Sequence, residues 1–452
     1  MSSLAAAVAA IEQLGPQGIA RFQASLHLSW IEEALMATGT ASIRRRKFPA
    51  EQAVWLVLGM ALFRDRAIDD VVGHLGLTLP GTGALAKSAI PVARRKLGPA
   101  PIKYLFQRVA GAWANAEKAG DYRGLTLLGI DGTCMRVQDS DANFAHFGKP
   151  TCRDGEGGGY PQLRLTALLN LGTRMVTDME FGAFETPEIA LAQPLIARLP
   201  DDSLTLVDRG FYSYKLVHDV THGGRNRHLL ARVRKNVEVE MLEVLADGTE
   251  RVQIHPSKSL RRTNPEFAEP LKGRVITYKH PGGEPSRLFT TLMDEVVYPA
   301  AELIGLYHDR WELEIAFDEL KTHMLERLES LRSKSPEGVE QELWGVFLLY
   351  NLVRREMLLT AQSIKVQPRR ISFWESLLLI RNVWITAWTT NAPGTIPRHL
   401  LDLRNNLAAL VLPERRSDRR YPRHVKIKMS NYNRNRGHRS SSKAIGQPAE
   451  GS

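Results

Sequence analysis

Two short apolar runs, each followed directly by an aspartate, constrain the fold of this chain most strongly. Residues 125–130 are built from Leu, Thr, Gly and Ile and lead into Asp131, and residues 204–207 lead into Asp208. Apolar runs without alternation are typical of strands that are buried on both faces. The pattern therefore predicts two buried strands, each with an acid at its C-terminal end.

Further strands and helices are expected around these two runs. Three more strands are expected at residues 163–170, 175–181 and 228–233. Thr186, Pro187 and Glu188 combine an N-cap residue, a proline for the first turn and an acid that complements the helix dipole, so a helix begins there. A second helix is expected at 213–222. The order of three strands, helix, strand, helix and strand resembles the ribonuclease H-like nuclease fold, an α/β fold with a mixed sheet.

A different pattern fills residues 234–286. It is irregular and β-like, with short Val- and Ile-containing runs separated by turn signals such as Asp247-Gly248. This segment predicts a β-rich insertion. The core is expected to resume with a strand at 288–292.

A polar stripe marks the helical pattern that follows Pro299 and runs to about Leu331. Its members are Tyr307, Arg310, Glu314 and Lys321. The gaps between them are close to whole helical turns, so all four share one face of an uninterrupted helix. An ordinary interpretation is a solvated face on which Arg310 and Glu314 pair.

The spacing of this stripe resembles a known family. Tyr307-(2)-Arg310-(3)-Glu314-(6)-Lys321 matches, gap for gap, the Tyr-Arg-Glu-Lys signature of the insertion sequence 4 family of DDE transposases. Asp131 and Asp208 precede it in the order that the family shows, and the longer gap lies between Asp208 and Glu314. The resemblance covers roughly residues 20–430, and the β-rich segment resembles the family's insertion between the second and third acids.

The resemblance implies a transposase of a bacterial insertion sequence, which binds terminal inverted repeats and carries out metal-dependent DNA cleavage and strand transfer. Asp131, Asp208 and Glu314 would be the catalytic residues and the ligands of two Mg²⁺ ions, for which Mn²⁺ substitutes. Carboxylates suit such hard cations, and a pair of cations can activate the attacking oxygen and stabilise the leaving one. Asp131, on the central strand, is expected to bridge both ions.

DNA contacts are expected from several side chains. Tyr307, Arg310 and Lys321 are assigned to the element end by the resemblance, and Arg209 follows Asp208 directly. Some relatives stack a flipped base on a tryptophan of the insertion. All eight tryptophans here lie outside 209–310. If a base is flipped, another aromatic residue such as Tyr278 or Phe289 is expected to take that part, or the mechanism differs.

The net charge of +11 and the pI near 9.6 favour a polyanionic partner. Residues 411–452 hold +8 of that charge and are rich in Ser, Asn and Pro, so a disordered tail is expected, either merely solvated or in contact with phosphates. A second basic run, Arg44-Arg45-Arg46-Lys47, joins helical patterns at 23–37 and 50–63, with a third helix at 67–75. That arrangement suits a helix-turn-helix-like DNA-binding unit, and an ordinary helical domain is the alternative.

Composition excludes several classes of protein. With 43% hydrophobic and 24% charged residues, the chain is not mainly disordered, collagenous or coiled-coil. Two cysteines, Cys134 and Cys152, cannot build a disulfide framework and favour a reducing compartment. No apolar stretch reaches the ~20 residues that span a bilayer. A cytoplasmic protein without a membrane partner is expected.

Four regions are predicted: an N-terminal helical DNA-binding domain (1–118), a ribonuclease H-like catalytic domain (119–335) with its β-rich insertion (234–286), a C-terminal helical region (336–412) and a basic tail (413–452). A homodimer that pairs two element ends on double-stranded DNA is expected from the resemblance. Two alternatives stay open. A catalytically inactive transposase-derived DNA-binding protein would bind without nicking, and a ribonuclease H-like nuclease or resolvase would cut without joining strands.

Overall fold

The computed structural model describes most of the chain up to Pro413. The described residues are 26, 28–42, 48–74, 77, 86–116, 121–150, 159–233, 237–279, 284–325, 330–389 and 396–413. The chain divides into two units, residues 1–412 and 413–452. The basic run Arg44–Lys47 and the predicted disorder of the tail both lie outside the described residues.

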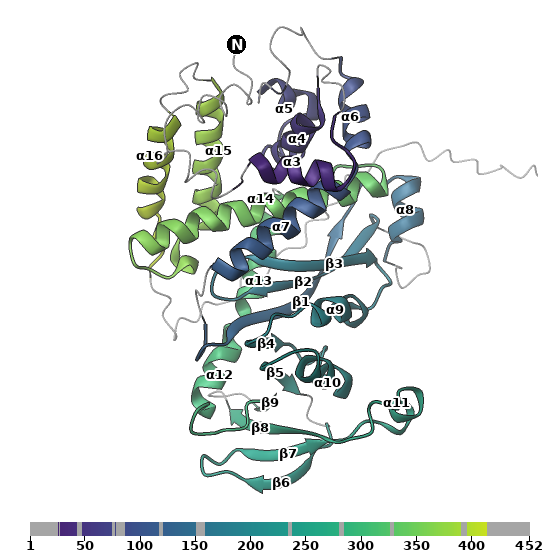
Figure 1. The fold of residues 1–452 in the computed structure, drawn as a ribbon, viewed down its shortest axis with the longest axis vertical. Coiled ribbons are helices and arrows are strands. Elements are labelled where there is room, and N and C mark those ends of the chain that lie inside the picture. The colour runs from purple at the N-terminus through teal and green to yellow at the C-terminus, as the bar shows by residue number, and fades with distance from the viewer. Residues whose placement is uncertain are drawn as a thin grey trace, which may run out of the picture. The chain divides into compact units, whose positions relative to one another are not determined.

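Among the described residues of 1–412, nine strands form one mixed sheet, in the order β3-β2-β1-β4-β5-β9-β8-β7-β6 (Figure 1). Strand β1 pairs antiparallel with β2 and parallel with β4, and β4 pairs parallel with β5. This order confirms the ribonuclease H-like α/β core predicted from the sequence. The strands are β1 (Thr126–Arg136), β2 (Gln162–Asn170), β3 (Val176–Ala183), β4 (Ser203–Val207), β5 (Arg227–Val233), β6 (Glu240–Val244), β7 (Glu250–Ile254), β8 (Leu271–Lys279) and β9 (Pro285–Thr290).

Helices cover both faces of this sheet. Successive residues of a strand point to opposite faces, and in the buried strands both sets are apolar. Leu128 and Ile130 belong to the core beneath α9 and α10, whereas Leu125 and Leu127 belong to the larger core shared with the N-terminal helices, α13 and α14. The helices next to the sheet in sequence are α8 (Asp141–Phe147), α9 (Glu188–Ala197), α10 (Tyr214–His222), α11 (Lys258–Thr263), α12 (Ala300–His308) and α13 (Trp311–Asp318).

The helices before and after the sheet pack together. Helix α14 is 28 residues long and lies against both α4 and α7, so one apolar core runs from Leu26 to Leu407. The predicted domain boundaries stay a prediction. None of the described helices is long and apolar enough to cross a membrane. The remaining helices are α3 (Leu28–Ala37), α4 (Ala50–Leu62), α5 (Ile68–His74), α6 (Ala89–Leu97), α7 (Ala100–Ala116), α14 (Pro336–Ser363), η2 (Pro368–Arg370), α15 (Phe373–Thr389) and α16 (Ile396–Ala408).

Strand β1 is longer than predicted. Its parallel pairing with β4 ends at Ile130, opposite Val207, but its antiparallel pairing with β2 continues to Arg136. The expectation that Asp131 ends a strand was therefore wrong. Asp131 lies within β1 at the position where the parallel partner stops, which leaves room beside it.

The β-rich segment adds strands to the same sheet. Strands β6, β7 and β8 pair antiparallel in sequence, and β9 joins them to the core by pairing antiparallel with β5. Phe289 on β9 packs so closely over Gly273 on β8 that a Cβ there would lie 2.2 Å from its ring. A glycine at this position lets the added strands stay in register with the core.

The single helix predicted from residue 300 to about 331 was wrong. Helix α12 ends at His308, α13 begins at Trp311, and a π-helical turn, η1 (Glu319–Met324), follows. At the junction, Asp309 N–H donates to Leu306 O at 2.9 Å and Arg310 N–H to Tyr307 O at 3.2 Å, so the turn tightens. The reasoning that placed four polar residues on one face assumed an uninterrupted helix and does not hold.

Candidate active site

Asp131 and Asp208 lie at neighbouring positions of two parallel strands. Ile130 pairs with Val207, and each aspartate is the next residue. Asp131 shares its face of β1 with Gly129, where a Cβ would lie 2.8 Å from Leu313 of α13. The first aspartate therefore points to the side of the sheet that α13 covers. The negative charge of Asp208 acts on the pKa of Asp131, which places the two carboxylates within electrostatic reach of each other.

Arg310 connects the first acid with the third. Its Nη2 donates to Oε1 of Glu314 at 2.9 Å, and its Nη1 lies 3.7 Å from Oδ2 of Asp131. The Arg310 side chain is 16% exposed and that of Glu314 is 42% exposed. Asp131 of β1 and Glu314 of α13, which are far apart in sequence, thus share Arg310 as a partner. Arg310 and Glu314 form the ion pair that the helical pattern suggested. Arg310 also lies close to an acid from β1, Asp131.

Burial dominates the electrostatics of Asp131. It raises the pKa of this carboxyl group to about 6, helped by Asp208 and Glu188, while the Gly132 N–H and Arg310 lower it. The Gly132 N–H donates to Asp131 Oδ1 at 2.8 Å. Negative charge at this position is therefore costly until a further positive charge arrives.

This cost gives a prediction for the pH dependence of stability. The folded chain holds the Asp131 proton more tightly than the unfolded chain does. Asp131 therefore has no effect on the stability of the fold below about pH 4, where both states are protonated. Between about pH 4 and pH 6 it lowers the free energy of unfolding progressively. The loss amounts to about 3 kcal/mol. We expect Asp131→Asn to be more stable than the wild type above pH 6 in EDTA, measured by denaturant unfolding from pH 4 to 7. Parallel pH profiles for the two proteins would contradict this.

The other predicted DNA-contacting residues occupy different places. Tyr307 is 7% exposed, and burial, with the charge of Asp208, raises its pKa to about 12 although Arg310 opposes this. Arg209 is exposed directly after Asp208. Lys321, on the π-helical turn, exerts its charge on the thiol of Cys134 in β1. Tyr307 therefore borders the acids from within the core, whereas Arg209 is open to solvent.

The two aromatic residues proposed for a flipped base differ in accessibility. Phe289 is fully buried in the core beneath α10, so that expectation was wrong for this residue. Its ring packs over Gly273 and edge-on to Tyr212, with ring centroids 5.4 Å apart, so a base cannot reach it. Tyr278 is partly exposed, and its ring lies edge-on to His308 with centroids 6.4 Å apart.

The donor chemistry of this site fits a hard divalent cation, because three carboxylates and no Cys or His are involved. The half-buried Asp131 also has too little positive charge around it to keep its ordinary pKa. Among the residues that the structure describes, no group of three or more His, Cys, Asp or Glu side chains is arranged to hold a metal ion. Arg310 lies between Asp131 and Glu314. Its guanidinium, a cation of the chain itself, pairs with the Glu314 carboxylate.

The strand order, the two neighbouring aspartates and the acid on the covering helix fit the class of DDE-type DNA transposases, and sequence comparison shows the same class. The profile described as "Transposase DDE domain" matches residues 123–352, and that described as "Insertion element 4 transposase N-terminal" matches residues 16–107. The chain belongs to the insertion sequence 4 family of transposases. This confirms the family and the function predicted from the helix signature.

Two relatives come from Escherichia coli (strain K12). "Transposase InsG for insertion sequence element IS4" is 35% identical over 398 residues, which cover 88% of this chain and 89% of the relative. "Putative transposase InsZ" is 33% identical over 233 residues, which cover 51% of this chain and 76% of the relative. A solved structure, the piggyBac transposase synaptic complex with hairpin DNA, aligns with a TM-score of 0.45 at 13% identity, over 92% of this chain and 88% of that one.

Proposed function

We propose that this transposase cuts DNA at the ends of its element and joins the freed 3′ ends to a target, with Asp131, Asp208 and Glu314 as the catalytic acids. The observation that supports the proposal is the position of Asp131 and Asp208 directly after paired residues of β1 and β4, with Arg310 in contact with both Asp131 and Glu314. Three carboxylates can supply the oxygen ligands that two Mg²⁺ or Mn²⁺ ions need for phosphoryl transfer. Bound cations would activate the attacking hydroxyl and stabilise the leaving oxygen.

The chain's own residues then have distinct parts. Arg310 presents a planar fork that can grip a phosphate as readily as a carboxylate. When a DNA phosphate enters, Arg310 exchanges its bond with Glu314 for bonds with that phosphate, which frees Glu314 to act as a ligand. Lys321 supplies a point charge to the same strand, and the buried Tyr307, within electrostatic reach of Asp208, supports the acids from the core side.

The partners are proposed on the same basis. The N-terminal region that matches the insertion element 4 profile would bind the terminal repeats. The +11 charge of the chain supports contact with DNA phosphates over a wide area. A homodimer would hold two element ends together, because joining both ends at one target requires two active sites.

The test uses the purified full-length chain with labelled double-stranded DNA that carries the sequences flanking its own coding region. With Mg²⁺ or Mn²⁺ and a plasmid target, we expect nicks at one defined position that leave a 3′-hydroxyl, followed by joined products. Binding without nicking would favour an inactive DNA-binding relic. Nicking without joined products would favour a nuclease of the same fold.

A further inference from the structure

Four buried charged residues hold the side of α13 that faces away from solvent. Arg174, in the turn between β2 and β3, donates to Glu312 of α13 and, at 2.8 Å, to Glu319 at the start of η1. Arg354 of α14 holds Glu319 from another direction. The four side chains are between 0% and 7% exposed. We name Arg174, Glu312, Glu319 and Arg354 the buried clamp.

The clamp fixes α13 because its bonds cannot be exchanged for water. Removing one partner of a buried ion pair leaves an uncompensated charge, which is far costlier than losing an exposed pair. Tyr350 adds to the network, since its hydroxyl donates to Glu319 at 3.0 Å and accepts from Arg354 Nε at 3.2 Å. Burial raises the pKa of Tyr350 further above its usual range, so this hydroxyl stays a donor. A shift of α13 would break several of these bonds together.

The backbone of Arg174 is held in an unusual conformation. Its φ is +59°, in the left-handed region that residues other than glycine rarely adopt. The turn is held by its own bonds, because Asn170 Oδ1 accepts from the Thr173 N–H at 3.0 Å and the Arg174 N–H donates to Asn170 O at 2.8 Å. A glycine at position 174 would avoid this backbone strain. An arginine there is therefore explained by the bonds that its side chain makes.

The clamp lies next to the proposed catalytic acid in sequence. Glu312 and Glu314 are two residues apart on α13, and Leu313 between them packs directly on Gly129 of β1. Arg174 extends from the end of β2, the strand that pairs with β1 across Asp131. These contacts, several of which Arg174 makes, set the position of α13 relative to β1. They thereby also set the position of Glu314 relative to Asp131.

We infer that Arg174 is a positioning residue for Glu314, an inference that rests on the catalytic role proposed above for Glu314. The clamp holds α13 against β1, so that Glu314 is kept in one position relative to Asp131 and Asp208. Residues that orient metal ligands typically alter activity by about 10–100-fold when replaced. Arg174 should therefore affect the chemical step and leave the binding of DNA unchanged.

The test compares Arg174→Lys with the wild type. Lysine keeps the charge but loses the fork that reaches Glu312 and Glu319 together. We expect the single-turnover nicking rate at saturating element-end DNA and Mn²⁺ to fall by about 10–100-fold, with an unchanged Kd for that DNA. Amide hydrogen exchange in residues 311–318, measured without DNA or metal, should become faster than in the wild type.

A matched control separates positioning from a general loss of stability. Arg274 is equally buried and bonds Thr249, Asp247 and the carbonyl of Tyr298, all outside α13. Arg274→Lys should leave exchange in residues 311–318 and the nicking rate unchanged. If Arg174→Lys does not fold, the charge-balanced double variant Arg174→Gln/Glu312→Gln takes its place and should show the same loss of rate and faster exchange.

Two results would overturn the inference: wild-type exchange in residues 311–318 of the Arg174 variants, or a loss of rate that Arg274→Lys reproduces. Failure of the proposed function looks different, since the wild type itself would then not cut. In that event the exchange measurement still decides whether Arg174 holds α13, and unchanged exchange would remove the clamp as well.

Discussion

Glu314→Gln is expected to lose about 10³-fold or more in nicking rate while it still binds element-end DNA. Stabilisation of developing charge by a bound cation is worth several kcal/mol, and each ~1.4 kcal/mol corresponds to a factor of ten in rate. Glutamine keeps the size of the side chain and can still accept from Arg310 through its amide oxygen, so the helix should stay in place. Single-turnover nicking and a gel-shift titration, on the same DNA and with Mn²⁺, measure the two quantities separately.

The matched control for this variant is Asp318→Asn. Asp318 is an exposed acid one helical turn beyond Glu314 on the same helix, and it accepts a hydrogen bond from Thr322 at 2.7 Å. It takes no part in the arrangement with Arg310 and Asp131. Asp318→Asn should therefore cut at the wild-type rate. A Glu314→Gln variant that still nicks, or equal losses in the two variants, would remove Glu314 from the proposed set of acids.

The sequence predicted the core of the sheet because its signals are local. Apolar runs without alternation at 125–130 and 204–207 mark strands that are buried on both faces, and the structure places them side by side as β1 and β4. The length of β1 could not be predicted in this way. Its second half, from Asp131 to Arg136, is held by antiparallel pairing with β2, and such pairing depends on a strand that follows only after α8 in the chain.

The site was predictable in part for a similar reason. The spacing from Tyr307 to Lys321 identified the helix and its acid, but the helical periodicity missed the break at Asp309 and the π-helical turn at Glu319. Arg369 pairs with Asp309 at 2.9 Å, and the buried clamp holds Glu319. Both deviations are thus associated with partners that lie far away in sequence. Arg174 lies in the hairpin turn between β2 and β3, and no sequence pattern around it indicates a partner on α13.

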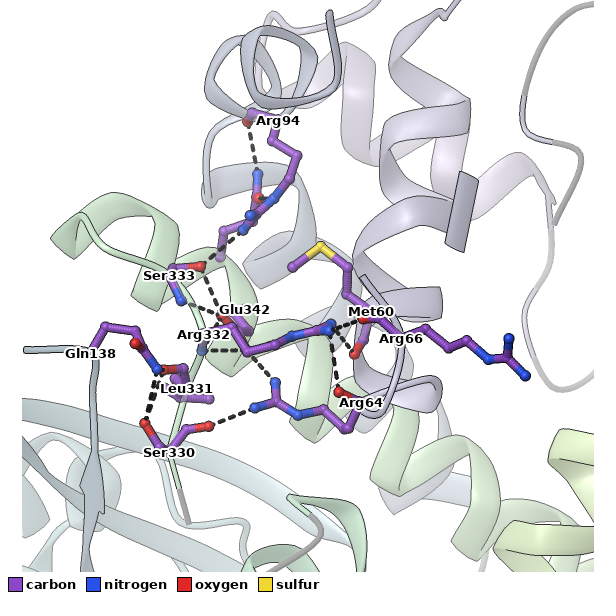
Figure 2. A network of polar contacts seen from close by, with 11 residues as sticks. Met60, Arg64, Arg66, Arg94, Gln138, Ser330, Leu331, Arg332, Ser333 and Glu342 are labelled. Atoms are coloured by element: carbon purple, nitrogen blue, oxygen red, sulfur yellow. Dashed lines mark hydrogen bonds and ion pairs between the residues drawn. The ribbon is translucent and has the colours of Figure 1, made fainter. Parts of the chain in front are cut away.

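A buried acid on α14 supports a second prediction of large effect. Glu342 of α14 is 1% exposed and pairs with Arg64, which follows α4 (Figure 2). It also accepts from the backbone N–H of Arg332 at 2.9 Å and from the Ser333 hydroxyl at 2.7 Å. Arg332 in turn donates to Met60 O at 2.7 Å. This network ties the N-terminal helices to α14 and to Arg332 and Ser333, which lie between η1 and α14.

Glu342→Gln should therefore lower the free energy of unfolding by about 3–5 kcal/mol, because it leaves the Arg64 guanidinium buried without a counter-charge. Burial opposes ionisation of Glu342, but Arg64, the Arg332 N–H and Ser333 together lower its pKa below the usual range. The stabilisation is then complete at neutral pH and is lost as pH falls through this lowered pKa. Denaturant unfolding at pH 7 should separate the variant clearly from the wild type, and the difference should shrink in acid.

Glu302→Gln, which breaks an exposed pair with Arg123, is the control and should change stability little, because solvent already screens that pair. Equal effects of the two substitutions would mean that the Glu342 network does not join the N-terminal helices to the catalytic core.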